Sequence, residues 1–335
     1  MNSNIDFIIP WVDGNDPEWQ KSFNSYAPKS AQIDDADESR FRDWGLLPYW
    51  FRGIEKFAPW VRKIHFITCG QVPQWLNLDA PKLHWVKHED YIPKKYLPVF
   101  NVNPLELNLH KIEGLSDKFV YFNDDTFIIR PISEQRFFKN GLPCDCAVCN
   151  VLLPTRQGVM SHIMTNNMAI INEHFDKHKA IKNNLSRWFN LKYGPQQLRT
   201  LLLWPWPQFS ILYEHHQPNA YLKSTYQEIW DLYGDQIEET SMTRFRSIAN
   251  YSQWLMRDWR LVKGEFEPYN VAKDSHSCIL GQDNLNAILR TIVHQQKSLF
   301  CINDGNISKD DAPKIKQQLL DAFNAILPEK SSFEK

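Results

Sequence analysis

The sequence predicts an α/β protein in which a doubly wound, mostly parallel sheet carries a helical insertion or second lobe. Two features support this fold class. Short apolar runs typical of buried strands alternate with segments of helical hydrophobic spacing over about the first 125 residues, which is the rhythm of βαβ units. Polar and acidic residues follow several of these strands, at the positions where ligands bind in such sheets.

The first half of the chain predicts four strands and three helices. The opening strand, residues 5–12, runs into a glycine-bearing turn at 13–17. A helix follows at 45–57, where Leu46, Trp50 and Ile54 recur at helical spacing, and Pro59 lies where it should stop. The remaining elements are strands at 64–68 and 83–86, helices at 73–77 and 105–112, and a strand that begins at 118.

The second half is less regular and mostly helical. Helical patterns cover residues 176–203, 224–234 and 247–260, and a late strand lies at 299–302. Ser308 with Asp311 resembles a capping box before an amphipathic helix that ends at Leu327. We therefore expect one integrated unit of three segments: a sheet-rich 1–150, a mostly helical 151–265, and 266–335, which returns to the sheet and ends in a helix.

Composition narrows the possible functions. The chain has 38 Lys and Arg residues against 39 Asp and Glu, a formal net charge of −1, so no overall basic field suggests nucleic-acid binding. No stretch approaches the roughly 18 apolar residues that a membrane span needs. The first residues have neither the basic nor the apolar region of a secretory signal. A cytoplasmic location is therefore the expectation.

Three of the six cysteines, Cys144, Cys146 and Cys149, form a C-x-C-x2-C cluster. Such spacing could hold zinc if a fourth ligand came from elsewhere, but no matching second pair is visible. The alternative is three reduced, half-buried strand residues, as expected in the cytoplasm. The sequence favours this second interpretation.

Asp124 and Asp125 stand side by side between apolar runs. Adjacent like charges repel, so either a positive group neutralises them or one of them stays protonated. From these residues alone two interpretations remain open: a polar turn, or a carboxylate pair that holds a divalent cation at a strand end. Asp13 and Thr68 also follow predicted strands, which makes this edge of the sheet a candidate site.

Longer motifs resemble the Stealth family, the hexose-1-phosphate transferases of bacterial capsule synthesis, to which animal lysosomal GlcNAc-1-phosphotransferase is related. The resemblance keeps the order of four signature regions over nearly the whole chain, although Pro48 departs from the basic residue expected there. The matching segments are 5–19; then 40–47, 50–61, 68–71 and 121–125; then 216–218 with Lys223, and 244–247; and finally 301–304. The resemblance implies a GT-A-like fold in which residues 1–150 bind a nucleotide sugar and 151–265 carry acceptor-binding and catalytic groups.

The resemblance also implies roles for single residues. His216 is expected to take the proton of an acceptor hydroxyl, because imidazole titrates near neutral pH. Its neighbour His215 should point the other way on an extended segment. Asp124 and Asp125 are expected to bind Mg²⁺ or Mn²⁺, Asp125 is also expected to be catalytic, and Arg246 is expected to grip phosphate oxygens. The expected substrate-binding residues are Asp13, Gly14, Asn15, Asp16, Arg42, Arg52, Asn123, Asn167, Lys223, Arg244, Asn303 and Asp304.

Simpler roles stay open for several of these residues. Residues 13–16 could form a plain turn, and Arg52 could be solvated. Asn167 could be a turn former. Arg244 and Arg246 would share one face only if they lie on a strand, and surface ion pairs would otherwise explain them.

The implied activity is transfer of a hexose-1-phosphate from a UDP-sugar to a hydroxyl of a growing capsular or cell-surface polysaccharide. N-acetylhexosamine-1-phosphate is the leading case, and the products are a phosphodiester and UMP. The implied partners are the donor, an acceptor that could be lipid-linked, and capsule assembly and export proteins at the inner membrane. The amphipathic 308–327 segment is a candidate docking helix, but its pattern favours packing against the core. Two other classes remain: a metal-dependent glycosyltransferase that releases UDP, and a non-catalytic sugar-binding protein.

Overall fold

The computed structural model describes residues 4–27, 42–153, 158–305 and 307–335. At its centre lies a five-stranded sheet in the order β10-β4-β1-β2-β3. Its strands are β1 (Ile5–Pro10), β2 (Ile64–Thr68), β3 (Leu83–Lys87), β4 (Lys118–Tyr121) and β10 (Asn219–Leu222). The first four run parallel, and β10 is antiparallel to β4 at the edge. The predicted α/β class with a mostly parallel sheet is confirmed.

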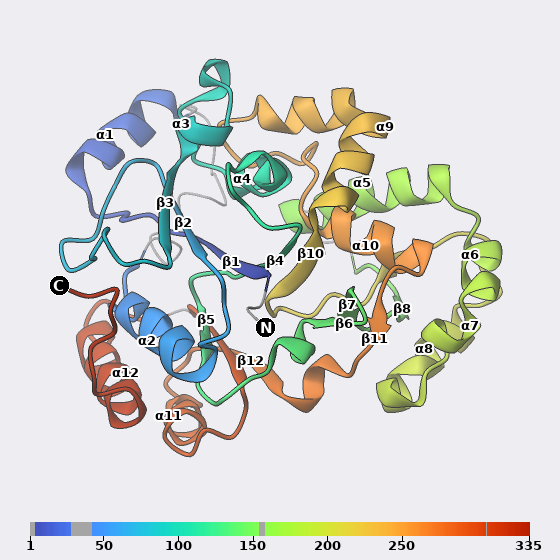
Figure 1. Cartoon of the computed structure of the whole chain (residues 1–335). Helices are drawn as coiled ribbons and strands as arrows, with labels where there is room; N and C mark the ends of the chain where they lie inside the picture. The colour runs from blue at the N-terminus through green and yellow to red at the C-terminus, as the bar shows by residue number, and fades with distance from the viewer. Residues whose placement is uncertain (1–3, 28–41, 154–157, 306) are drawn as a thin grey trace.

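The sheet is covered on both faces because its strands are apolar on both sides. Phe7 and Ile9 of β1 belong to one core, while Ile8 between them belongs to the other. Figure 1 shows α2 (Leu47–Phe57), α11 (Leu285–Val293) and α12 (Ala312–Ile326) grouped on the first side. The second side carries α9 (Lys223–Ser241) and α10 (Trp254–Lys263).

A smaller sheet adjoins the first core in the order β12-β13-β5. It contains β5 (Thr126–Ile128), β12 (Ser275–Ile279) and β13 (Leu299–Asn303), so β4 and β5 lie in different sheets although only four residues separate them. The C-terminal segment was expected to return to the central sheet. Instead its strand β13 joins β5, and the late strand that completes the central sheet is β10 from the middle segment.

The middle of the chain forms a helical lobe at the side of the sheet (Figure 1). Its helices are α5 (Val159–His174), α6 (Lys177–Asn183), α7 (Leu185–Trp188) and α8 (Gln197–Leu202). The small elements elsewhere are α1 (Pro17–Tyr26), α3 (His88–Tyr91), α4 (Val102–Leu107), β6 (Phe138–Lys139), β7 (Leu142–Asp145), β8 (Cys149–Asn150), β9 (Ile211–Leu212) and β11 (Glu267–Pro268).

Most predicted elements are confirmed, with three differences. The expected helix at 73–77 is wrong, because Leu76 forms a β-bridge with Glu334 near the C-terminus. Helix α5 was not predicted, and residues 244–247 do not form a strand. The Asp311 N–H donates to Ser308 Oγ at 3.1 Å, but the N-cap of α12 is Asp311 and no side chain caps the helix, so Ser308 holds the turn before α12 and is not its cap.

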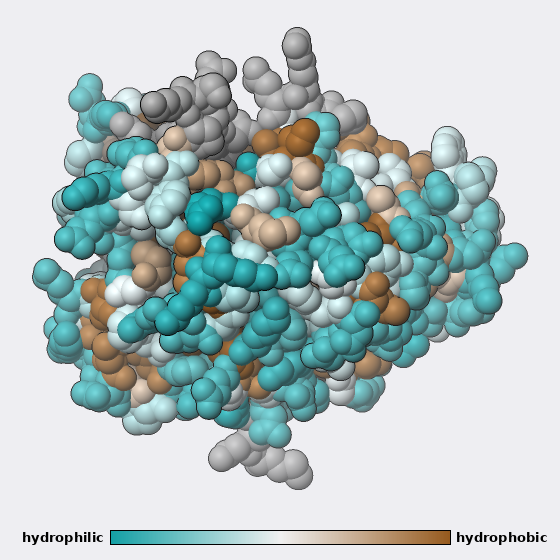
Figure 2. All heavy atoms as spheres, turned by 90° about the horizontal axis from the view of Figure 1, so that it is seen from above, coloured by the Kyte–Doolittle hydropathy of each residue, from teal (hydrophilic) through white to brown (hydrophobic). Residues whose placement is uncertain are grey.

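Polar side chains cover most of the face shown in Figure 2, where hydrophobic side chains occur in smaller groups. Within the described ranges, no helix is both long and apolar enough to cross a membrane. The apolar face of α12, with Ile315, Leu319 and Phe323, is buried in the core. Helix α12 is therefore a packing element, and its apolar face is not available for docking onto a membrane.

Candidate active site

The predicted site residues meet where the sheet changes direction. The chain leaves β1 toward β2 and β3 on one side, then returns to β4 on the other side of β1. The carboxyl ends of β1 and β4 therefore lie next to each other at a topological switch point, the usual ligand site of such sheets. The turn at 13–16 follows β1, and Asn123, Asp124 and Asp125 follow β4.

The turn after β1 is held by the loop after β2. Gln71 accepts from the Asp13 N–H at 2.9 Å and donates to the Asp13 carbonyl and to the Asp16 carboxylate. The Gln71 bond lowers the pKa of Asp16, which also caps α1 by accepting from the Glu18 N–H. The Asp16 side chain thus shapes the turn, while Asn15 is exposed and free to meet a ligand with its side chain. Gln71 itself was missed as a functional residue, although it follows a strand end.

Asp125 and His216 face each other across the site. His216 Nε2 lies 3.6 Å from the Asp125 carboxylate, and Asn303, at the end of β13, also bonds to the imidazole. The two contacts raise the pKa of His216 above its ordinary value, and the contact with Asp125 has the larger effect. The structure therefore brings together Asp125, His216 and Asn303, which follow one another along the chain at intervals of about 90 residues.

Asp124 reaches solvent but is surrounded by protein on most sides. The pKa of Asp124 is raised to about 7, mainly because the carboxylate loses hydration and also because Asp125 and Asp43 repel it. A divalent cation between the two carboxylates would relieve this repulsion. Carboxylate oxygens are the ligands that Mg²⁺ and Mn²⁺ prefer, so Asp124 and Asp125 fit such an ion.

Cys301 completes a second possible ligand group. One atom each of Asp125, His216 and Cys301 lies within 4.8 Å of the others. The Cys301 thiol is buried, and burial together with Asp125 raises its pKa. A protonated thiol is a poor ligand for a hard cation, so a Mg²⁺ or Mn²⁺ site at this position rests on the carboxylates.

The backbone of His216 is fixed from β12. Ser277 Oγ donates to the His216 carbonyl at 2.7 Å, and the Gln217 side chain donates to the same Ser277 Oγ at 2.6 Å. His215 points the other way, into the protein, as expected for neighbours on an extended segment. The 214–217 segment is thus held on both sides.

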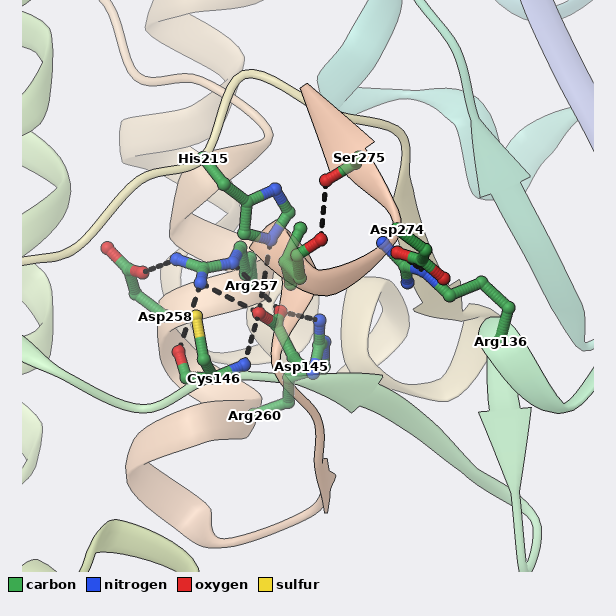
Figure 3. A network of polar contacts seen from close by, with 10 residues as sticks. Arg136, Asp145, Cys146, His215, Arg257, Asp258, Arg260, Asp274 and Ser275 are labelled. Carbon is green, nitrogen blue, oxygen red and sulfur yellow. Dashed lines mark hydrogen bonds and ion pairs between the residues drawn. The ribbon is translucent and has the colours of Figure 1, made fainter. Parts of the chain in front are cut away.

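The inner anchor of this segment is a buried ion network around Asp145 (Figure 3). Asp145 accepts two bonds of 2.8 Å from Arg257, one of 2.5 Å from Arg260 and one of 3.1 Å from His215. Burial opposes the charge of Asp145, but the two arginines outweigh it and hold the pKa of Asp145 well below its usual range. Burial lowers the pKa of His215 to about 4, so this imidazole is neutral. Sequence analysis missed the network, because its members are up to 115 positions apart.

A cleft of about 730 Å³ opens beside the turn after β1. It is lined by Gly14 and Asn15 and by the α1 side chains Trp19 and Phe23. The charged residues of the lining are Arg42, Asp43, Lys309 and Lys316. Arg42 also contacts Asp304 at 3.6 Å, which connects the cleft to the end of β13. Three cations and an indole suit an anionic ligand that carries a ring.

Arg244 and Arg246 lie in a loop against α1. The Arg244 guanidinium stacks on Tyr26, and the intervening Phe245 stacks on Phe100 with ring centroids 5.4 Å apart. Because residues 244–247 do not form a strand, the condition under which the two arginines would share one face is not met. The positive charge of Arg246 acts on buried Glu106, which contacts Tyr121 at the end of β4. Arg246 therefore lies toward the same edge of the sheet as Asp124.

Three expected substrate-binding residues are placed elsewhere. Lys223 follows β10, which is antiparallel to β4, so Leu222 pairs with Lys118 at the amino end of β4, opposite the site. Arg52 donates two bonds to Glu334 and one to the Leu327 carbonyl. Asn167 is buried and exchanges hydrogen bonds with Ser252. Lys223 is excluded by strand direction, and Arg52 and Asn167 are engaged in structural contacts.

The three clustered cysteines do not form a metal site among the described residues. All three are buried, and burial raises their pKa values to about 11, 12 and 11. Cys144 Sγ contacts the Gln135 carbonyl. They are thiols packed in the core.

The chemistry available at this edge of the sheet is that of an enzyme acting on an anionic substrate: a base beside carboxylates, next to a cationic cleft. Comparison with known proteins agrees with this class. Stealth protein conserved region 1 matches residues 3–31, and Stealth protein conserved region 2 matches residues 40–144.

Full-length relatives have related names. The capsular polysaccharide phosphotransferase WcwK of Streptococcus pneumoniae is 41% identical, with 99% of this chain and 98% of the relative covered. The exopolysaccharide phosphotransferase cps2G of Lactiplantibacillus plantarum is 35% identical over 99% and 96% of the two chains. The receptor polysaccharide phosphotransferase WefC of Streptococcus gordonii is 37% identical over the whole of both chains. The chain belongs to the Stealth family, and the predicted enzyme class, a phosphotransferase, is confirmed.

Among solved structures, the galactosyltransferase LgtC in complex with donor and acceptor sugar analogs overlaps 96% of both chains, with a TM-score of 0.42 and 8% sequence identity. A likeness of this degree says nothing about the site.

Proposed function

We propose that the enzyme transfers a hexose-1-phosphate, with N-acetylhexosamine-1-phosphate as the leading case, from a UDP-sugar to a hydroxyl of a capsular or cell-surface polysaccharide. The observation that carries the proposal is the pairing of His216 with Asp125 at the switch point, beside a cationic cleft. The names of the full-length relatives support the polysaccharide acceptor.

The reaction exchanges one P–O bond for another. The acceptor oxygen attacks the phosphorus that bears the sugar, the bond from this phosphorus to the oxygen shared with the second phosphate breaks, and UMP leaves with the bonding electrons. His216 takes the hydroxyl proton, and the Asp125 carboxylate stabilises the imidazolium that forms. The 3.6 Å separation is longer than an ordinary hydrogen bond, so the imidazole is not locked to Asp125 before the proton arrives.

Charge on the phosphoryl oxygens grows during the transfer, and fixed cations stabilise it. Arg42, Lys309 and Lys316 would face the diphosphate in the cleft, with Trp19 offering a surface for stacking a ring. A Mg²⁺ or Mn²⁺ ion held by Asp124 and Asp125 would supply further charge neutralisation. Arg246 is proposed to assist from its side of the sheet edge.

The test is incubation of the purified protein with a panel of UDP-sugars, a polysaccharide acceptor and Mg²⁺ or Mn²⁺. Chromatography measures UMP and UDP, and phosphorus NMR detects the phosphodiester. Release of UMP with a new phosphodiester is expected, and chelation should stop it. Release of UDP would assign the protein to the glycosyltransferases instead. No product with any donor would refute the proposal.

A further inference from the structure

The helical lobe exposes hydrophobic side chains on one short stretch of the chain. The exposed fractions are 90% for Leu191, 56% for Leu198, 52% for Leu201, 73% for Leu202 and 59% for Trp206. Leu198, Leu201 and Leu202 follow the spacing of one helical face, while Thr200 of the same helix is buried and accepts from the Cys149 N–H. We call these five residues the α8 apolar surface.

The α8 apolar surface is rigid rather than poorly folded. The buried Lys177 ammonium donates to the carbonyls of Leu203 and Trp206, at 2.5 and 2.8 Å. The His178 ring bonds to the Trp204 carbonyl at 2.8 Å. The backbone of the turn after α8, which carries Trp206, is therefore held in place by these bonds. Exposed leucines on a fixed frame mark an interaction surface.

The charge of this part of the chain identifies the partner. Residues 175–213 contain six Lys and Arg residues and one acidic residue, Asp176, in a chain that otherwise balances its charges. Asp176 is occupied as the cap of α6. Lys192 and Arg199 directly follow Leu191 and Leu198 and are exposed. Exposed leucine and tryptophan side chains with the exposed cations Lys192 and Arg199 beside them match the boundary between headgroups and acyl chains of an anionic bilayer.

We propose that the α8 apolar surface docks the enzyme onto an anionic lipid membrane. Trp206 and His216 are only ten positions apart in the chain, so docking would hold the predicted base within about 35 Å of the bilayer surface. The proposal concerns binding alone and does not depend on the reaction assigned above. A second copy of the chain on the same surface is the competing occupant.

The test is sedimentation of the purified protein with phosphatidylcholine vesicles that contain about a third phosphatidylglycerol, and with vesicles of phosphatidylcholine alone. The test variant carries Leu198→Gln, Leu202→Gln and Trp206→Gln. The matched control carries Leu232→Gln, Met242→Gln and Ile248→Gln, three exposed apolar residues outside the surface. Both variants should keep the melting temperature of the parent protein and its turnover on a water-soluble acceptor.

The parent protein and the control should bind the anionic vesicles, more weakly at high salt, and the test variant should bind at least about tenfold more weakly. Equal binding of the test variant and the parent would overturn the proposal. So would equal binding of the parent to both kinds of vesicle, since the cations would then have no role. Absence of vesicle binding, together with a parent dimer that the test variant converts to a monomer, would assign the surface to a second copy of the chain.

Discussion

Replacement of Asp145 by asparagine should destabilise the protein strongly and disturb the site at a distance. The amide keeps the shape of the carboxylate but removes the charge that pairs with the buried guanidiniums of Arg257 and Arg260; the Asp258 carboxylate, 3.5 Å from Arg257, is a longer contact of one of them. Removing one partner of a buried ion pair costs about 3–5 kcal/mol. For 335 residues, an unfolding entropy of about 2.1 cal/mol/K per residue corresponds to about 0.7 kcal/mol per degree. The melting temperature should therefore fall by about 4–7 °C.

The assay is thermal unfolding followed by circular dichroism, with Asp79→Asn as the control. Asp79 is exposed, so its variant should melt within about 1 °C of the parent. Turnover measured well below the transition should also fall in Asp145→Asn, because His215 loses its anchor and the 214–217 segment carries His216. A fall in melting temperature below about 2 °C would refute the reasoning, since it would mean that water or a neighbouring group replaces the carboxylate.

Three further predictions concern the base, a relocated arginine and a buried acid. His216→Ala should lower turnover about 10²–10⁴-fold while the dissociation constant of the donor stays nearly constant, because proton transfer acts in the transition state; near-normal turnover would give the base role to another group. Arg52→Ala should lower the free energy of unfolding by about 1–3 kcal/mol without changing the KM for the donor, since Arg52 bonds to Glu334, and a raised KM would return Arg52 to the substrate site. Burial raises the pKa of Glu106 to about 7. Between pH 4.5 and 7 the folded state therefore holds a proton that the unfolded state releases, so this group makes stability fall with rising pH, by on the order of 3 kcal/mol. The stability of Glu106→Gln relative to that of the parent should therefore be higher at pH 8 than at pH 5. If the melting temperatures of the two proteins changed in parallel with pH, the result would contradict this prediction.

The sequence predicts the central sheet well because its signals are local. The strands β1, β2 and β4 are apolar runs with polar residues within three positions after their ends, and this pattern also located Asp124 and Asp125. Helix α2 could be predicted from Trp50 and Ile54, which recur at helical spacing and pack into the core. Helix α5 left a weaker signal of the same kind in Ile163, Ile170 and Ile171.

The errors come from contacts between distant parts of the chain. Arg52 meets Glu334, 282 positions away, and Leu76 forms its bridge with the same residue. Lys223 was misplaced because nothing in its own segment indicates that β10 runs antiparallel to β4. Strand direction at a sheet edge is decided by how the connecting chain returns, here through the whole helical lobe.

The edge position of β10 has a consequence for fragments of this protein. Strand β10 covers the backbone N–H and C=O groups along the outer side of β4, and β13 does the same for β5. A fragment that stops at residue 150 would keep β4 and β5 but lack both partners. Uncovered edges of short apolar strands pair readily with other chains, so such a fragment should aggregate during expression instead of folding as a nucleotide-binding module. The N-terminal half can therefore be produced in isolation only if a strand equivalent to β10 is supplied with it.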